Sequence, residues 1–149
     1  MKAVIQRVRS AKVTINHQIV GEIKKGLVIL LGVKEGDIEN QAKTLAKKIA
    51  NLRIMSDKED KMNLSVKDVG GEVLVVSQFT LLADCKKGNR PSFIKAAHPE
   101  FAKELYLKFI EELKNLGIKK VAVGEFGAIM DIHLINDGPV TIVLDTENM

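Results

Sequence analysis

The sequence has almost nothing that would build a disulfide framework, a membrane span or a signal peptide. Its single cysteine, Cys85, has no partner in the chain, which excludes an internal disulfide and a cysteine-based zinc site. No apolar run approaches the roughly 18 residues that a membrane-spanning helix needs. The opening stretch MKAVIQRVRSAKVTI alternates charged and apolar residues, unlike the apolar stretch of a signal peptide. These absences predict a soluble cytoplasmic protein without membrane contact.

Internal repeats, low-complexity tracts and linker-like segments are also missing. A length of 149 residues suits one domain with a substantial core, so we expect a single domain over residues 1–149. The net charge of +4 comes partly from lysine doublets such as Lys24-Lys25 and Lys86-Lys87. This mild excess permits an anionic partner, nucleic acid included, without identifying one.

Strand patterns occupy most of the chain. Alternation from Lys2 to Ile23 predicts two or three strands, with turns near Arg9-Ser10 and Asn16-His17. The run from Gly26 to Val33 is apolar throughout, which is typical of a strand covered on both faces. The stretch from Glu72 to Asp84 predicts a long central strand. We expect three further strands to close the chain, in KKVAVG, AIMDIHLI and VTIVLD.

Two segments have helical spacing. Apolar residues from Ile38 to Leu52 follow Asp37, a candidate N-cap, and a second helix has Pro99 in its first turn and Gly117 at its end. The apolar stripe of the second helix is expected to comprise Phe101, Leu105, Phe109, Leu113 and Leu116. Because regular βαβ alternation is missing, we expect a β-rich α/β (α+β-like) fold rather than a doubly wound one. Its antiparallel or mixed sheets would pack in a barrel-like manner with two main helices.

The usual catalytic constellations are scarce. Ser77, His133 and Asp131 can be drawn as a triad, but His133 and Asp131 are neighbours on one strand face and would point in parallel. The same two side chains lack a third metal ligand at a suitable spacing, and no phosphate-binding loop is present. We therefore expect neither a metal nor an organic cofactor.

Two polar stretches interrupt otherwise apolar strands. In VVSQFTLL, a central strand would bury Ser77, Gln78 and Thr80, and a buried polar group without a partner costs about 1–3 kcal/mol. In NDGPVT, Gly138 and Pro139 stand at a strand entrance, either as a plain turn or as backbone shaped for a purpose. Ordinary packing or turn formation explains either stretch taken alone.

Taken together, the motifs SQFTL (77–81) and NDGPVT (136–141) resemble the paired signatures of the D-aminoacyl-tRNA deacylase family, formerly called D-tyrosyl-tRNA deacylase. The segments MKAVIQRV, GLVILLGV, LRIM, GNRPSF and GEFGAIMDIHLINDGPVTI look like the family in the same order. The resemblance covers the whole chain, with no departure inside the two signature motifs. It implies the D-aminoacyl-tRNA deacylase-like fold and hydrolysis of the ester in D-aminoacyl-tRNA, a proofreading reaction.

The resemblance also implies where this reaction takes place. The family forms a homodimer with active sites at the interface. The backbone around Gln78, Phe79 and Thr80 would line the reacting centre, and Ser77 and Gln78 would support it by hydrogen bonds. With no base visible near Thr80, we favour hydrolysis assisted by the 2′-hydroxyl of the substrate, with Thr80 in a positioning role. The catalytic residues would thus act mainly through preorganised hydrogen-bond donors.

Two further pairs of residues have implied roles. Gly138 and Pro139 would be joined by a cis peptide bond and reach into the pocket of the other subunit, where their backbone rejects L-aminoacyl groups. Glycine, which has no side chain, would pass this filter. Phe126 and Met130 would hold the terminal adenosine of the tRNA acceptor end, although both also suit an ordinary core. Lys86, Lys87 and Arg90 are candidates for phosphate contacts by their location.

Two alternatives to this function remain open at the level of the sequence. The chain could hydrolyse another small ester or amide with Thr80 as the nucleophile. It could also be a noncatalytic RNA-binding domain. Release of a D-amino acid from charged tRNA separates the second alternative from the deacylase, and the effect of replacing Thr80 separates the first.

Overall fold

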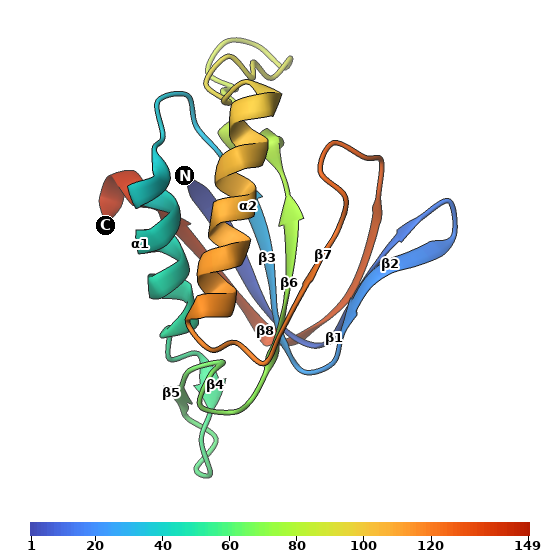
Figure 1. Ribbon diagram of the computed structural model, residues 1–149, viewed down its shortest axis with the longest axis vertical. Coiled ribbons are helices and arrows are strands. Elements are labelled where there is room, and N and C mark those ends of the chain that lie inside the picture. Colours follow the sequence, from blue (N-terminus) through green and yellow to red (C-terminus); the bar gives the residue numbers. More distant parts are fainter.

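The computed structural model describes residues 1–149 and contains a six-stranded sheet, a two-stranded sheet and two α-helices (Figure 1). Both helices lie on the same face of the large sheet, and both termini lie beside the first helix (Figure 1). The elements in chain order are β1 (Lys2–Ile15), β2 (Gln18–Ile23), β3 (Gly26–Gly32), α1 (Glu39–Ala50), β4 (Met55–Ser56), β5 (Met62–Leu64), β6 (Glu72–Ser77), the 3₁₀ helix η1 (Phe79–Leu82), α2 (Pro99–Asn115), β7 (Lys120–Val123), β8 (Asp131–Asp145) and the 3₁₀ helix η2 (Thr146–Asn148).

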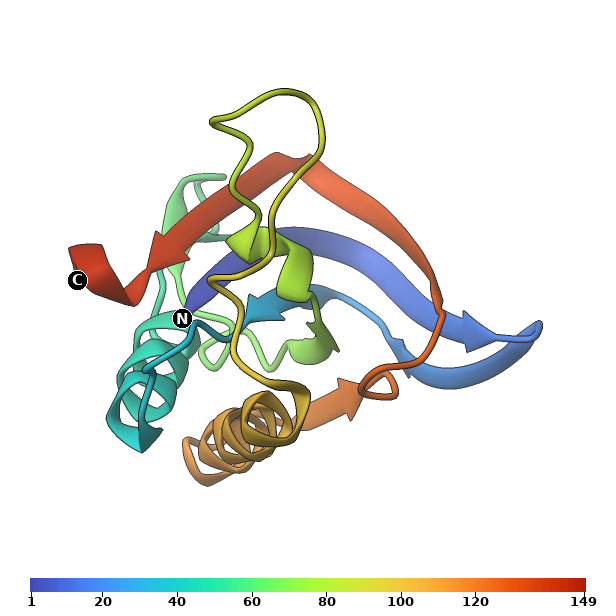
Figure 2. The same cartoon turned by 90° about the horizontal axis from the view of Figure 1, so that it is seen from above.

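The large sheet is mixed and strongly curved. Its strand order is β2-β1-β3-β6-β7, and β8 pairs with the remaining edge of β1. Strand β1 is antiparallel to β2, β3 and β8, whereas β3, β6 and β7 run parallel. Figure 2 shows β1 and β8 bending together across the molecule, so that the sheet curls into a nearly closed barrel. The expected β-rich α/β fold with mixed, barrel-like packing and two helices is confirmed.

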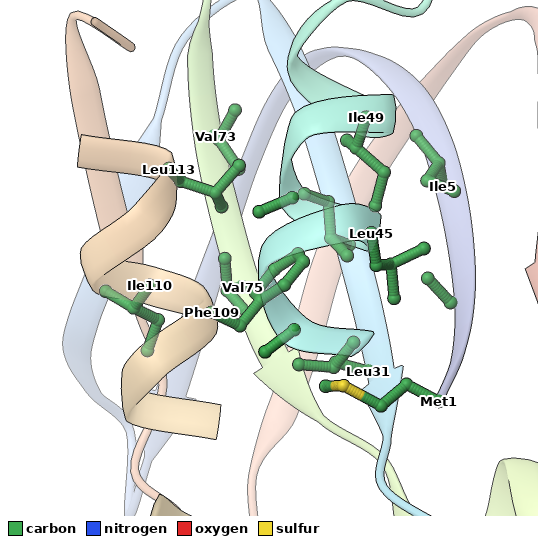
Figure 3. Close-up of a cluster of buried hydrophobic side chains, with 14 of the residues drawn as sticks. Met1, Ile5, Leu31, Leu45, Ile49, Val73, Val75, Phe109, Ile110 and Leu113 are labelled. Atoms are coloured by element: carbon green, nitrogen blue, oxygen red, sulfur yellow. The ribbon is translucent and has the colours of Figure 1, made fainter. Parts of the chain in front are cut away.

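The core is divided by the sheet into two clusters. The larger one, with 25 buried residues, fills the space between the sheet and the helices. Figure 3 shows Phe109 and Leu113 of α2 and Leu45 of α1 directed at Val75 and its neighbours on the strands. The smaller cluster of seven buried residues lies inside the curl of the sheet. Strand β3 contributes to both clusters, which explains its uninterrupted apolar sequence.

The strands differ from the sequence-based expectation at three places. The expected strand from Glu72 to Asp84 ends at Ser77, where the backbone turns at Gln78 into η1. The predicted turn near Arg9-Ser10 is wrong, because β1 is continuous there and only its register with β8 shifts. The last two of the three closing strands form one strand, β8, because pairing with β1 continues on both sides of the NDGP segment. The turn at Asn16-His17 is confirmed.

Both helices are present with adjusted ends and faces. Asp37 does not cap α1: Ile38 is the N-cap, and Gln41 Oε1 accepts a hydrogen bond from its N–H at 2.8 Å. Pro99 begins α2 as expected, and Gly117 follows it with φ +88°. Phe101 is 40% exposed, so it is not part of the buried stripe, to which Ala102, Tyr106 and Ile110 belong instead.

Asp37 has a different role, because it lies in the interior beside the chain end. Its carboxylate lies 2.9 Å from the amino nitrogen of Met1 and accepts a hydrogen bond from the N–H of Lys34. The Met1 amino group also donates to Thr146 Oγ1 at 2.7 Å. These contacts fix the first residue, the β3–α1 connection and η2 to one another. No helix combines the length and the apolar character needed to span a membrane.

Candidate functional site

A cavity of about 640 Å³ opens where β6 ends. This volume falls in the range of roughly 300–1,000 Å³ that is typical of small-molecule sites. Its walls come from the end of β6, the first turns of α2, the preceding loop and the segment between β7 and β8. Thirteen of its 18 lining residues are hydrophobic, so a ligand with an apolar group is favoured.

Three of the four residues expected at the reacting centre line this cavity: Ser77, Gln78 and Phe79. Ser77 is the last residue of β6 paired with β3, opposite Leu31. The N–H of Gln78 still donates to the carbonyl oxygen of Leu31 at 2.7 Å, and the chain then leaves the sheet as η1. The structure therefore places these residues at the transition from a buried strand to an exposed helical turn.

Thr80 lies one step outside the cavity wall and is exposed. Its Oγ1 accepts a hydrogen bond from Gln78 Nε2, which leaves the hydroxyl hydrogen of Thr80 free for another acceptor. No carboxylate or imidazole is bonded to this hydroxyl. The N–H groups of Phe79 and Thr80 donate no hydrogen bond within the chain, as expected for the start of a helical turn.

Phe126 and Met130 both lie in the cavity wall. The Phe126 ring packs against the ring of Tyr106 with centroids 5.5 Å apart, and it also contacts the larger core cluster. The Met130 sulfur accepts a hydrogen bond from the N–H of Glu125 at 3.4 Å. It fits there because residue 124 is glycine: a Cβ at Gly124 would come within 2.6 Å of the sulfur. The pair is thus anchored to the core while facing the cavity.

Gly138 and Pro139 are not brought to the cavity of their own chain. Their peptide bond is cis, as the resemblance implies, and both residues are exposed. In the strand register, Ser77 is level with Leu31 on β3, Ala3 on β1 and Leu144 on β8. The Gly-Pro segment therefore lies three strands away from Ser77 along the sheet, on the part of β8 that precedes Leu144. One chain alone does not unite the two signature motifs.

The Gly138-Pro139 segment is held by polar side chains on both sides. Asn136 spans it, accepting from the N–H of Val140 at 2.8 Å. Arg7, whose side chain is 11% exposed, donates to the carbonyl oxygens of Asp137 at 2.9 Å and Ile54 at 2.8 Å. These bonds link the segment to β1 and to the connection after α1. The backbone at Gly138 is consequently presented to solvent in a fixed position.

Sequence reasoning missed several side chains of the cavity: Phe93, His98 and Tyr106. Phe93 meets Phe79 edge to face, with centroids 5.2 Å apart. Tyr106 donates to the carbonyl oxygen of Val75 at 3.4 Å, and burial raises the pKa of Tyr106 to about 12. Two signals were available: the GNRPSF segment, which includes Phe93, and the helical spacing of Tyr106. The burial of Tyr106 against β6 is a tertiary property and could not be read from the sequence.

The alternative triad does not form. Ser77 lines the large cavity, whereas His133 lines a separate hollow with Lys12, Lys24 and Glu22. The Nε2 atom of His133 lies 3.3 Å from Thr14 Oγ1, within hydrogen-bonding distance. His133 and Ser77 therefore cannot share a proton. The chain also brings no three His, Cys, Asp or Glu side chains together as a metal site.

Comparison with known sequences identifies close relatives of the chain. The model of the D-Tyr-tRNA(Tyr) deacylase family matches residues 4–145. A D-aminoacyl-tRNA deacylase of Desulfotalea psychrophila is 56% identical over 149 residues, which cover 100% of this chain and 99% of the relative. A D-aminoacyl-tRNA deacylase of Fusobacterium nucleatum is 56% identical over 148 residues, with coverage of 99% and 97%.

Solved structures show the same architecture. A c-Myc DNA Unwinding Element Binding Protein superposes with a TM-score of 0.92 at 41% identity, covering 97% of this chain and 98% of that chain. A probable eukaryotic D-amino acid tRNA deacylase superposes with a TM-score of 0.80 at 15% identity, covering 96% and 97%. At 15% identity the second likeness concerns the fold alone.

Proposed function

The chain belongs to the D-aminoacyl-tRNA deacylase family, and from this premise we propose how its residues recognise and hydrolyse the substrate. It is a hydrolase of the aminoacyl ester bond in D-aminoacyl-tRNA, and its products are the free D-amino acid and tRNA. The observation that carries the proposal is the mostly apolar cavity at the end of β6, whose wall includes Ser77, Gln78 and Phe79. We place the reaction in the cytoplasm, together with its tRNA substrate.

The reacting ester lies at the start of η1 in this proposal. Water adds to the ester carbonyl, the bond from the carbonyl carbon to the ribose oxygen breaks, and that oxygen leaves as a hydroxyl. The free N–H groups of Phe79 and Thr80 donate to the negative oxygen that develops during this step. One such donor contributes about 3–4 kcal/mol to lowering the barrier in other hydrolases.

Thr80 positions the substrate rather than attacking it. Gln78 donates to Thr80 Oγ1, so the hydroxyl hydrogen of Thr80 points to a further acceptor such as the substrate. A nucleophilic threonine would need a base to take its proton, and no imidazole or carboxylate is bonded to it. The neighbouring 2′-hydroxyl of the ribose assists the addition of water instead. The reaction so described uses no metal and no organic cofactor.

The terminal adenosine occupies the wall formed by Phe126 and Met130. Base stacking on an aromatic ring contributes about 1–3 kcal/mol per base. Phe126 is held in place by Tyr106, so its ring is preorganised for such a contact. The thioether of Met130 adapts to the shape of the ligand.

Gly138 and Pro139 read the handedness of the amino acid from a second subunit. Their exposure, and their separation from the cavity of their own chain, support a role in the site of a partner. A two-fold homodimer would exchange the two segments symmetrically. Fixed backbone then fills one side of the substrate α-carbon, which rejects L-residues and admits glycine and many D-residues.

A paired assay tests this proposal. We expect release of the amino acid from D-tyrosyl-tRNA and not from L-tyrosyl-tRNA under identical conditions. Gly138→Ala should abolish this preference, because a Cβ there would lie 2.9 Å from the Val140 nitrogen and 2.8 Å from its Cγ2, forcing the segment to move. Gly36→Ala is the matched control, since it lies in open space. An unchanged D-to-L rate ratio in Gly138→Ala would exclude the filter.

The same assay separates the two alternative functions. Complete loss of turnover in Thr80→Val with undisturbed tRNA binding would favour a nucleophilic threonine. A chain that binds tRNA but releases no D-amino acid would be a noncatalytic RNA-binding domain.

A further inference from the structure

The loop between η1 and α2 carries a cluster of cations outside the site described above. Its tip, residues 85–91, is exposed throughout and contains Lys86, Lys87 and Arg90 but no acidic residue. None of these three side chains forms an ion pair with another part of the chain. We call residues 85–91 the basic tip. Figure 1 shows this loop, in yellow-green, above the first turn of α2.

The base of the loop is closed by bonds that leave the charges of the basic tip free. Asp84 and Ser92 exchange two backbone hydrogen bonds, of 2.8 and 2.9 Å. The Asp84 carboxylate accepts from the N–H of Lys86 and lies 3.1 Å from Lys95 Nζ, and these contacts hold its pKa below the usual value. Asp84, the acidic residue nearest to the tip in sequence, therefore has its partners at the base of the loop. The tip side chains remain available to an external anion.

The base of the loop that carries the basic tip runs directly into the wall of the cavity. Phe93 follows the closing residue Ser92 directly, lines the cavity and contacts the Phe79 ring edge to face. A ligand that leaves the cavity past Phe93 would reach the base of the loop that carries Lys86, Lys87 and Arg90. Because the tip has no aromatic side chain, it suits contact with backbone phosphates rather than with bases.

We propose that the basic tip binds phosphates of the single-stranded nucleotides that precede the terminal adenosine of the substrate tRNA. The inference rests on the proposed function, which places that adenosine in the cavity. It assigns affinity for the RNA chain to the basic tip and leaves the chemical step to the cavity. A second group of cations, Lys119 and Lys120, lies at the opposite end of β6, where Lys120 pairs with Glu72.

The test compares two substrates that differ in phosphates. D-tyrosyl-tRNA carries the phosphate chain, whereas D-tyrosyl-adenosine has only the nucleoside and the ester. The triple variant Lys86→Ala/Lys87→Ala/Arg90→Ala should raise KM for D-tyrosyl-tRNA about tenfold or more at low salt, with unchanged kcat. The slope of log KM against log salt should fall by about 2 if all three cations contact phosphates. KM for D-tyrosyl-adenosine should stay the same.

The matched control is Lys119→Ala/Lys120→Ala, which removes two exposed charges from the far end of the sheet. It should leave the KM for both substrates and the salt slope unchanged. Two results in the triple variant would overturn the proposal. One is an equal rise in KM for both substrates, and the other is an unaltered KM and salt slope for D-tyrosyl-tRNA.

Failure of the proposed function gives a different result. If the unmodified chain hydrolyses neither substrate, the dissociation constant of uncharged tRNA still reports on the basic tip. Weaker, less salt-dependent tRNA binding in the triple variant would then support phosphate binding by the basic tip, even though the deacylase activity is absent. Unchanged tRNA binding in that variant would overturn the proposal that the basic tip binds phosphates as well.

Discussion

At the scale of single residues, Tyr106 offers a direct probe of the cavity wall. It is the only tyrosine, and the chain has no tryptophan, so its ionisation can be followed alone. Burial raises its pKa from 10.0 to about 12. Tyrosinate absorbance should therefore appear near pH 12 in the folded protein and near pH 10 in denaturant.

The shift also predicts how stability depends on pH. Below pH 10 the phenol is protonated in both states, and between about pH 10 and 12 only the unfolded chain loses the proton. The free energy of unfolding should thus fall with rising pH in this window, by at most about 1.4 kcal/mol per pH unit from this group. Tyr106→Phe should show a shallower fall in urea denaturation. Identical slopes in the two proteins would contradict the buried position of the phenol.

Single residues were predictable from sequence where a motif specifies them. SQFTL and NDGPVT marked Ser77, Gln78 and Gly138, and the structure places the first two at the cavity. Arg7 was not predictable, because its partners Asp137 and Ile54 are brought to it only by the folded sheet and the connection after α1. A lone arginine in an alternating strand has the same sequence pattern as any exposed one.

At the scale of elements, close packing of β3 against β6 requires Gly26. A Cβ at this position would lie 1.7 Å from the carbonyl oxygen and 2.6 Å from the carbonyl carbon of Glu72. Both are backbone atoms of the neighbouring strand, so neither can move without disturbing the pairing. Gly26→Ala should destabilise the protein by about 3 kcal/mol or more.

Urea denaturation checks this prediction against a matched control. Gly70 has φ +63° and nothing within 4 Å of an added Cβ, so Gly70→Ala should cost only about 1 kcal/mol, for backbone conformation alone. Equal losses of unfolding free energy in the two variants would show that the contact with Glu72 does not cause the destabilisation of Gly26→Ala.

Elements were predictable where periodicity is long and regular. Both helices and the doubly covered strand β3 follow from their apolar spacing. The end of β6 was missed because the alternation of Phe79 and Leu81 continues the strand pattern into η1. The continuity of β8 was missed because Gly138 and Pro139 favour a turn locally, while pairing with β1 on both sides maintains the strand.

At the scale of the whole molecule, the two signature motifs are separated within one chain. The cavity contains Ser77 and Gln78, whereas Gly138 is exposed three strands away. Sequence alone could pair the motifs by resemblance but could not show this separation. The separation is the physical reason for proposing that a complete site needs two subunits.

The most direct measurement of this central claim is activity in mixed dimers. In the proposed dimer, Gly138→Ala disturbs the filter that a subunit lends to its partner. Gln78→Ala/Thr80→Val removes the two side chains that position the substrate in the subunit's own cavity, so each variant alone should lack D-selective hydrolysis. After co-refolding in equal amounts, half of the dimers should be mixed, and each should hold one complete site. We predict recovery of about a quarter of the unmodified D-selective rate. No recovery, in mixtures shown to contain mixed dimers, would contradict a site shared between subunits.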